Sequence, residues 1–425
     1  MSARWTVPKG TRDLLPPETT LWWRVEEVAR RVFRRHGYGE IRTPVFEASG
    51  LFERAVGEET DIVGKEMYTF LDRGGRSLTL RPESTAPVCR AYVEHRLDRG
   101  PQPIRWYYIG PQFRYERPQK GRFRQFHQIG AERLGAGGPD ADVEVLLLLV
   151  DFLEALGFQD LEVRLNTVGD AASRAAYREA LVAYLRPLAD QLGPDSQRRL
   201  ERNPLRILDT KSPEEQQLLT GAPVLADFLT AEARQHFELV CSTLQSFGIR
   251  FRREPKLVRG LDYYTHTVFE VTAVGLGAQD ALCGGGAYAG LVEELGGPPT
   301  YGVGFAIGQD RLMEVLPAVS PVRHEQDRKL VLCRLPAREG DEAAFLVAAN
   351  RLARQLRQRD WTVLLHAGRP ERALEVADRV GATAVLFLGE RELREEQVRV
   401  RRLSNRSQEV VSWKQLEEFF GSWNP

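Results

Sequence analysis

The sequence has few cysteines and no long run of apolar residues. Its 425 residues include only four scattered cysteines, with no CxxC pair: Cys89, Cys241, Cys283 and Cys333. This pattern indicates neither a disulfide framework nor a cysteine-based zinc site, and the expected compartment is the reducing cytoplasm. The longest apolar stretch, residues 145–150, is bracketed by Glu144 and Asp151 and is far too short to span a bilayer. We therefore expect no membrane partner.

An excess of charge of one sign is also missing, because 59 Lys and Arg residues balance 59 Asp and Glu residues. Net charge offers no general attraction to nucleic acid, so any polyanion site has to be local. Histidine is scarce, with 7 residues and no HxxxH or HExxH pair, which argues against a catalytic zinc ion. We predict no metal fixed by protein ligands.

The composition is that of a globular protein, with 42% hydrophobic and 28% charged residues. The length suggests two or three domains. Residues 1–325 mix helix and strand patterns, and a mainly helical, charged stretch at about 171–247 resembles an insertion. From residue 326 to 425, strands and helices alternate, which is typical of a small α/β domain.

Helical spacing of apolar residues runs from Leu21 to Phe33, and an extended segment through Pro44 follows. Residues 104–109 and 126–132 have the aromatic and β-branched character of strands. The glycine run at 284–286 lies between two later strand patterns. It would let the backbone approach a ligand closely, and a tight turn is the alternative.

The segment between residues 110 and 128 is the densest chemical signal. Five cations surround Glu116, which suits phosphate binding by guanidinium groups: Arg114, Arg117, Lys120, Arg122 and Arg124. A solvated charged hairpin is the alternative. Strand alternation places Arg114 with Glu116, and Gln128 with Glu132, on shared faces, which favours a pocket.

This hairpin resembles that of the histidyl-tRNA synthetases, a class II family. So do residues 259–264 (Arg-Gly-Leu-Asp-Tyr-Tyr), 302–312, 8–13, 60–67, 80–83 and 203–209. The helix and Pro44 segment is similar to motif 1 at the family's dimer interface. The hairpin is similar to motif 2, and the Arg311 segment to motif 3.

The resemblance implies an α+β fold: a class II antiparallel sheet with flanking helices, a helical insertion, and a C-terminal α/β anticodon-binding-like domain. It also implies a cytoplasmic homodimer that activates L-histidine with ATP and Mg²⁺ to histidyl-adenylate. The histidyl group would then pass to the 3′ end of tRNA(His).

Residue roles follow from the same resemblance. Arg259 and Arg114 would be catalytic, stabilising charge at the α-phosphate. ATP would contact Arg114, Glu116, Arg122 and Arg311. Histidine would contact Glu83, Thr85, Gln128, Glu132, Tyr263, Tyr264 and Tyr288. Arg117 and Gln119 would reach the acceptor end of the tRNA.

Two groups of arginines in the C-terminal part predict local basic patches that suit nucleic acid: Arg351, Arg354, Arg357 and Arg359, and Arg399, Arg401, Arg402 and Arg406. The alternative is a solvated helix face.

The chain departs from the family pattern at Ala287 and Ala289, where the family usually has Arg and Asp. This departure favours a rival reading, a catalytically inactive histidine-sensing paralogue that regulates ATP phosphoribosyltransferase. Such paralogues typically lack the C-terminal domain and the equivalent of Arg259, and this chain has both.

Overall fold

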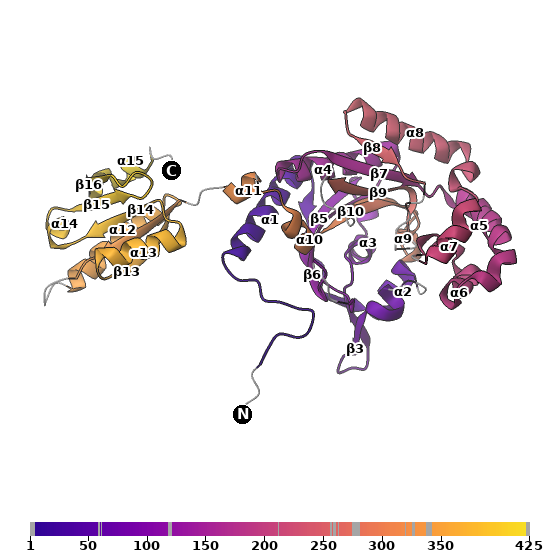
Figure 1. The fold of residues 1–425 in the computed structure, drawn as a ribbon, viewed down its shortest axis with the longest axis horizontal. Helices are drawn as coiled ribbons and strands as arrows, with labels where there is room; N and C mark the ends of the chain where they lie inside the picture. The colour runs from indigo at the N-terminus through magenta and orange to yellow at the C-terminus, as the bar shows by residue number, and fades with distance from the viewer. Residues whose placement is uncertain are drawn as a thin grey trace. The chain divides into compact units, whose positions relative to one another are not determined.

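The computed structural model describes residues 5–421 except 58–59, 61, 118–120, 211, 256, 258–260, 262, 274–280, 319, 325–327 and 337–341. The chain divides into two compact units, Met1–Arg323 and His324–Pro425 (Figure 1). Among the described residues, no helix is long and apolar enough to cross a membrane.

An eight-stranded sheet forms the centre of the first unit, with the order β1-β5-β6-β11-β10-β9-β7-β8. Its strands are β1 (Gly39–Glu40), β5 (Ile104–Phe113), β6 (Gln125–Gly135), β7 (Leu161–Thr167), β8 (Phe251–Arg253), β9 (Thr265–Ala273), β10 (Ala281–Tyr288) and β11 (Tyr301–Gly308). Pairing is antiparallel except for β1 with β5 and β7 with β8. The predicted antiparallel class II architecture is confirmed.

Alternation along the strands separates two apolar layers. In β5, Tyr107 joins the core formed with α1 (Glu18–Arg35) and α4 (Pro139–Ala155). The next residue, Tyr108, joins a different core, built with α2 (Ser49–Val56), α3 (Thr85–Glu94) and α9 (Leu291–Glu294). The helices therefore cover both faces of the sheet, and the second layer contains the candidate site.

Helix α1 begins before Leu21 and buries the periodic residues predicted from the sequence, including Val25 and Phe33. The extended segment around Pro44 is broken into β1 and β2 (Phe46–Ala48). A second, three-stranded sheet has the order β2-β4-β3, with β3 at Tyr68–Leu71 and β4 at Ser77–Leu80.

Residues 171–246 are helical in each of their regular elements: α5 (Ala171–Leu185), η3 (Arg186–Gln191), α6 (Pro194–Arg202), η4 (Pro204–Asp209), α7 (Pro213–Leu218), η5 (Leu219–Gly221), η6 (Leu225–Phe228) and α8 (Ala231–Ser246). Tyr177, Leu181 and Leu185 belong to a separate small core of this region. Figure 1 shows α5, α6 and α7 grouped beside the sheet.

The second unit is an α/β sheet with the order β13-β12-β14-β15-β16. Its elements are β12 (Lys329–Arg334), α12 (Glu342–Arg357), β13 (Thr362–Ala367), α13 (Pro370–Val380), β14 (Ala384–Leu388), α14 (Glu390–Arg394), β15 (Gln397–Arg402), β16 (Gln408–Ser412), η7 (Trp413–Gln415) and α15 (Leu416–Gly421). The three strands β12, β13 and β14 are parallel, and β15 and β16 form an antiparallel hairpin.

The tight-turn alternative for the glycine run was wrong, because residues 284–286 lie inside the central strand β10. A Cβ at Gly285 would lie 2.2 Å from the carbonyl oxygen of Gly304, and one at Gly286 would lie 2.6 Å from that of Thr267. The glycines thus permit close strand contact. Ala287 is fully buried in the same strand, between Thr265 and Val303.

Candidate active site

A cavity of about 150 Å³ lies on the sheet face that carries Tyr108. Its walls come from α3, β5, β6, β10, β11 and the segments around them, and they bring together all seven predicted histidine-binding residues. The lining residues are Glu83, Thr85, Tyr108, Arg114, Gln128, Glu132, Leu261, Tyr263, Tyr264, Gly284, Tyr288, Gly304, Phe305 and Ala306.

Glu132, on β6, is buried and surrounded by hydroxyl donors. Its Oε1 accepts a hydrogen bond from Thr85 Oγ1 at 2.8 Å and a longer one from Tyr108 OH at 3.4 Å. Its Oε2 accepts one from Tyr288 OH at 2.7 Å. Burial raises the pKa of Glu132 to about 8, although these hydrogen bonds oppose the rise.

Glu83 lies just before α3, where unpaired helix N–H groups favour an anion. Its carboxylate accepts hydrogen bonds from the backbone N–H of Thr85 at 2.6 Å and of Ala86 at 2.9 Å. Burial nevertheless raises the pKa of Glu83, so its negative charge lacks full compensation. Arg81 does not hydrogen-bond to Glu83; its guanidinium donates instead to the carbonyls of Pro111 and Thr43, both at 2.9 Å.

Three tyrosines form an aromatic wall. The ring centroids of Tyr263 and Tyr264 are 4.8 Å apart, and those of Tyr263 and Tyr288 are 5.6 Å apart. Gln128, at the end of β6 that faces the hairpin, lines the same cavity, and its buried Oε1 has no hydrogen-bond partner among the described residues. An unsatisfied buried amide oxygen is costly, so this atom is a natural contact for a ligand.

Arg114 is fixed beside Glu83 at the end of β5. Its Nε donates to the carbonyl of Pro82 at 2.9 Å, and its guanidinium carbon lies 5.4 Å from the centre of the Phe126 ring. Glu116 has one carboxylate oxygen 3.7 Å from Arg114 Nη1 and the other 3.7 Å from Arg122 Nη1. The hairpin therefore places two guanidinium groups on either side of one carboxylate.

The remaining predicted residues fall outside this group. Arg311, on α10 (Gln309–Val315), lies 3.8 Å from Glu314 and borders the hairpin at Gly121, whose Cβ would lie 3.4 Å from Arg311 Cδ. Arg117 is exposed. Arg259 and Gln119 lie outside the described residues.

Six of the lining residues were not predicted as site residues, namely Tyr108, Leu261, Gly284, Gly304, Phe305 and Ala306. Tyr108 resembled an ordinary aromatic strand residue, although its alternation with the core residue Tyr107 was a usable signal. Gly304 has no side chain to mark it, yet a Cβ there would lie 1.8 Å from Glu132 Oε2.

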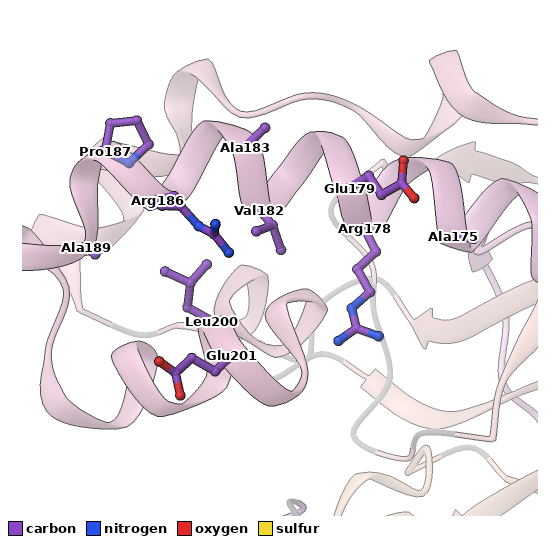
Figure 2. Close-up of a pocket in the computed structure, with 10 residues that line it drawn as sticks. All are labelled: Ala175, Arg178, Glu179, Val182, Ala183, Arg186, Pro187, Ala189, Leu200 and Glu201. Carbon is purple, nitrogen blue, oxygen red and sulfur yellow. The ribbon is translucent and has the colours of Figure 1, made fainter.

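A second, larger hollow of about 1050 Å³ lies between α5, η3 and α6. Figure 2 shows its lining, which is mostly alanine, valine, leucine and proline, with Arg178 and Arg186 balanced by Glu179 and Glu201. This balance gives no attraction for a polyanion, and we assign no site there.

Comparison with known proteins agrees with the geometry. A family described as histidyl-tRNA synthetase matches residues 10–312, and one described as an anticodon binding domain matches residues 332–423. A histidine–tRNA ligase from Thermosynechococcus vestitus is 50% identical over 96% of this chain and 94% of its own. One from Desulfitobacterium hafniense is 46% identical over 97% of this chain and 98% of its own.

Among solved structures, the apo histidyl-tRNA synthetase of S. aureus has a TM-score of 0.80 at 34% identity, covering 98% of this chain and all of its own. An ATP phosphoribosyltransferase regulatory subunit/histidyl-tRNA synthetase from Bacillus halodurans has a TM-score of 0.65 at 23% identity, covering 92% of this chain and 99% of its own, and shares the fold. The chain belongs to the histidyl-tRNA synthetase family of ATP-dependent aminoacyl-tRNA ligases.

Proposed function

We propose that the enzyme attaches L-histidine to tRNA(His) in two steps. The histidine carboxylate first attacks the α-phosphate of ATP, which gives histidyl-adenylate and releases pyrophosphate. The 3′-terminal hydroxyl of the tRNA then takes the histidyl group and releases AMP. The observation that supports this proposal best is that buried Glu132, with its three hydroxyl donors, lines the same small cavity as Glu83 and Arg114.

Glu132 would select histidine by accepting an imidazole N–H. Thr85 and Tyr288 hold its carboxylate in place, so the selecting group is fixed before the ligand binds. A pocket built around a hydrogen bond rejects amino acids that lack the donor, because the buried carboxylate would then lose the hydrogen bond from the ligand with no water to replace it. Tyr263 and Tyr264 would supply an apolar wall for the imidazole ring.

Glu83 would bind the α-ammonium group of histidine. Its buried carboxylate has two backbone donors and a raised pKa, so a ligand cation would supply the missing charge. Thr85 and the amide of Gln128 would complete the contacts to the amino-acid end. With these assignments, the histidine carboxylate would lie near Arg114.

Arg114 and Arg259 would stabilise the charge that develops at the α-phosphate during attack. Arg114 is held by the carbonyl of Pro82 and so needs little reorganisation. Arg122 would contact the terminal phosphates, Glu116 would orient Arg114 and Arg122, and Arg311 would pack on the adenine.

Mg²⁺ would arrive on the phosphates of ATP. This ion keeps several waters and usually takes one or two carboxylates together with substrate phosphates. Glu116 would be the carboxylate available to the ion, because its oxygens lie 3.7 Å from Arg114 and Arg122. Bound there, the ion would neutralise phosphate charge and favour departure of pyrophosphate.

The tRNA would contact both units. Arg117 and Gln119 would meet its acceptor end, and the C-terminal unit, which matches an anticodon-binding family, would meet its anticodon. In that unit, Arg357 and Arg359 have internal partners, the carbonyl of Val363 and the carboxylate of Glu417. The exposed Arg351 and Arg354 are therefore the better candidates on α12.

We also propose a homodimer that works in the cytoplasm. Phe46 and Phe70, about half exposed on the three-stranded sheet, bring their ring centres within 6.4 Å of each other. Such an exposed aromatic pair suits an interface. We expect Phe70→Asp to give a monomer in light scattering, while Phe247→Asp, an exposed position after α8, leaves the mass unchanged.

The four cysteines are free and buried, which fits the proposed cytoplasmic, reducing compartment.

Pyrophosphate exchange tests the proposed activity. The purified enzyme should exchange pyrophosphate into ATP in the presence of histidine, without tRNA, and should not do so with other amino acids. Binding of histidine without exchange would support the histidine-sensing alternative instead. Charging of tRNA(His) with labelled histidine then tests the second step.

A further inference from the structure

The N-terminal segment Pro8–Asp13 has no part in the proposed mechanism. Its residues nevertheless contact both parts of the proposed ATP site, the hairpin that carries Arg122 and the helix α10 that carries Arg311. The backbone N–H of Arg124, on the returning arm of the hairpin, donates to the carbonyl of Gly10 at 2.7 Å. A Cβ at Gly10 would lie 2.7 Å from the Arg124 side chain. The segment therefore packs directly against the arm that follows Arg122.

Arg12 links this arm to α10. Its guanidinium carbon lies 4.8 Å from the centre of the Phe123 ring, and its Nη2 lies 3.2 Å from Asp310 Oδ1. Asp310 is almost fully buried, and its other oxygen accepts the backbone N–H of His127, on β6, at 2.9 Å. Arg12 thus joins the residue after Arg122 to the residue before Arg311.

Other contacts fix Arg12 itself. The ring centre of Trp22, on α1, lies 5.7 Å from its guanidinium carbon, and Glu18 accepts from its Nη1 at 2.8 Å. The pair with Glu18 is exposed and therefore weak. The contacts with Asp310 and Phe123 are better shielded, and a planar guanidinium serves both because it can stack and donate at once.

We propose that Arg12 is a positioning residue for ATP. By holding Phe123 to Asp310, it sets the separation of Arg122 from Arg311, the two residues assigned to opposite ends of the nucleotide. The proposed histidine contacts lie elsewhere, on α3 and just before it, on β6 and on the tyrosines. Arg12 therefore acts on the affinity for ATP and not on that for histidine. This inference rests on the proposed function of those two arginines.

The test is pyrophosphate exchange by full-length Arg12→Met, Arg12→Lys and Glu18→Gln, with ATP and histidine varied separately. Met keeps an unbranched apolar stem but lacks the guanidinium group, and we expect the KM for ATP to rise about three- to tenfold, with the KM for histidine within about twofold of wild type. Lys keeps the pair with Asp310 but stacks less well, so it should be intermediate. Glu18→Gln, which removes only the exposed partner, should resemble wild type.

Phe123→Leu provides an independent check. If Arg12 acts through Phe123, the variants Arg12→Met and Phe123→Leu both break the same contact. The KM for ATP of the double variant should then be no higher than that of the single variant with the higher KM. An unchanged KM for ATP in Arg12→Met, or equal increases for ATP and histidine, would overturn the inference. Absence of exchange by the wild type would instead refute the proposed function. ATP affinity measured by calorimetry would then decide on Arg12, and equal affinities of wild type and Arg12→Met would overturn its role.

Discussion

The hydroxyl of Tyr288 on β10 donates to the carboxylate of Glu132 on β6 at 2.7 Å, across the intervening strand β11. This contact is possible because the residue of β11 paired with Glu132 is Gly304, and a neighbouring one, Gly302, lies beneath the Tyr288 ring. A Cβ at Gly302 would lie 2.0 Å from Tyr288 Cε2. The proposed selecting carboxylate is therefore held by a side chain that spans two glycines.

Gly304→Ala should remove histidine binding, since its Cβ would lie 1.8 Å from Glu132 Oε2 and 2.5 Å from the carbonyl of Ala131. We expect a loss of about 1 to 3 kcal/mol in the free energy of unfolding as well. Gly308→Ala, in the same strand, is the control, because its Cβ would only touch Arg311 at 3.8 Å. Calorimetric histidine binding and thermal melting measure both effects. Normal affinity in Gly304→Ala would contradict the assignment of Glu132.

The raised pKa of Glu132 predicts how stability changes with pH. Burial moves this pKa from 4.5 to about 8, so the folded enzyme holds a proton that the unfolded chain has lost in this interval. The contribution of Glu132 to the free energy of unfolding of the ligand-free enzyme should therefore fall as pH rises from about 5 to about 8. Glu132→Gln should remove this contribution.

Only the difference between wild type and Glu132→Gln isolates this effect. Burial lowers the pKa values of His127 and His266, and these two groups make stability rise with pH in both proteins. The raised pKa of Glu83 acts in the same direction as that of Glu132, also in both. Thermal melting at a series of pH values provides the comparison, and parallel curves for the two proteins would show that Glu132 is ionised in the ligand-free enzyme.

Local pattern predicted the secondary elements well wherever one face of an element meets solvent and the other the core. Helix α1 and the strands of the second unit are examples, because periodicity directly records such burial. The strand that contains the glycine run, β10, was not predicted, for the opposite reason. Its glycines are required by neighbouring backbone atoms from distant parts of the sequence, which no local pattern contains.

The same distinction applies to the site. Glu132 and Gln128 stood out because polar residues on an aromatic strand contradict a simple core. The partners that hold Glu132 come from α3 and β10, 47 and 156 residues away in sequence. Residues that contact the site from such distant parts of the sequence, above all Tyr288, were predicted from the family resemblance. Gly304 was predicted neither from the local pattern nor from the resemblance.

Arg259→Ala should slow adenylate formation by about 100- to 1000-fold, the usual effect of losing one donor to a developing anion. Its effect on histidine affinity should be much smaller, because the proposed histidine contacts are made by other residues. Single-turnover formation of adenylate gives the rate, and equilibrium binding gives the affinity. A dominant loss of histidine binding would move Arg259 into the amino-acid pocket.

Removing residues 329–425 should separate the two steps of the reaction. Each unit has apolar cores of its own. Those of the second unit include Leu332, Phe345 and Phe387, and those on the catalytic sheet are built from residues up to Val322. Pyrophosphate exchange should then be largely kept, whereas charging of tRNA(His) should fall by at least about tenfold as the anticodon contacts are lost. The control is the circular dichroism spectrum of the truncated protein, which should show that the first unit is still folded. Equal losses in both assays would mean that the second unit supports the catalytic fold itself.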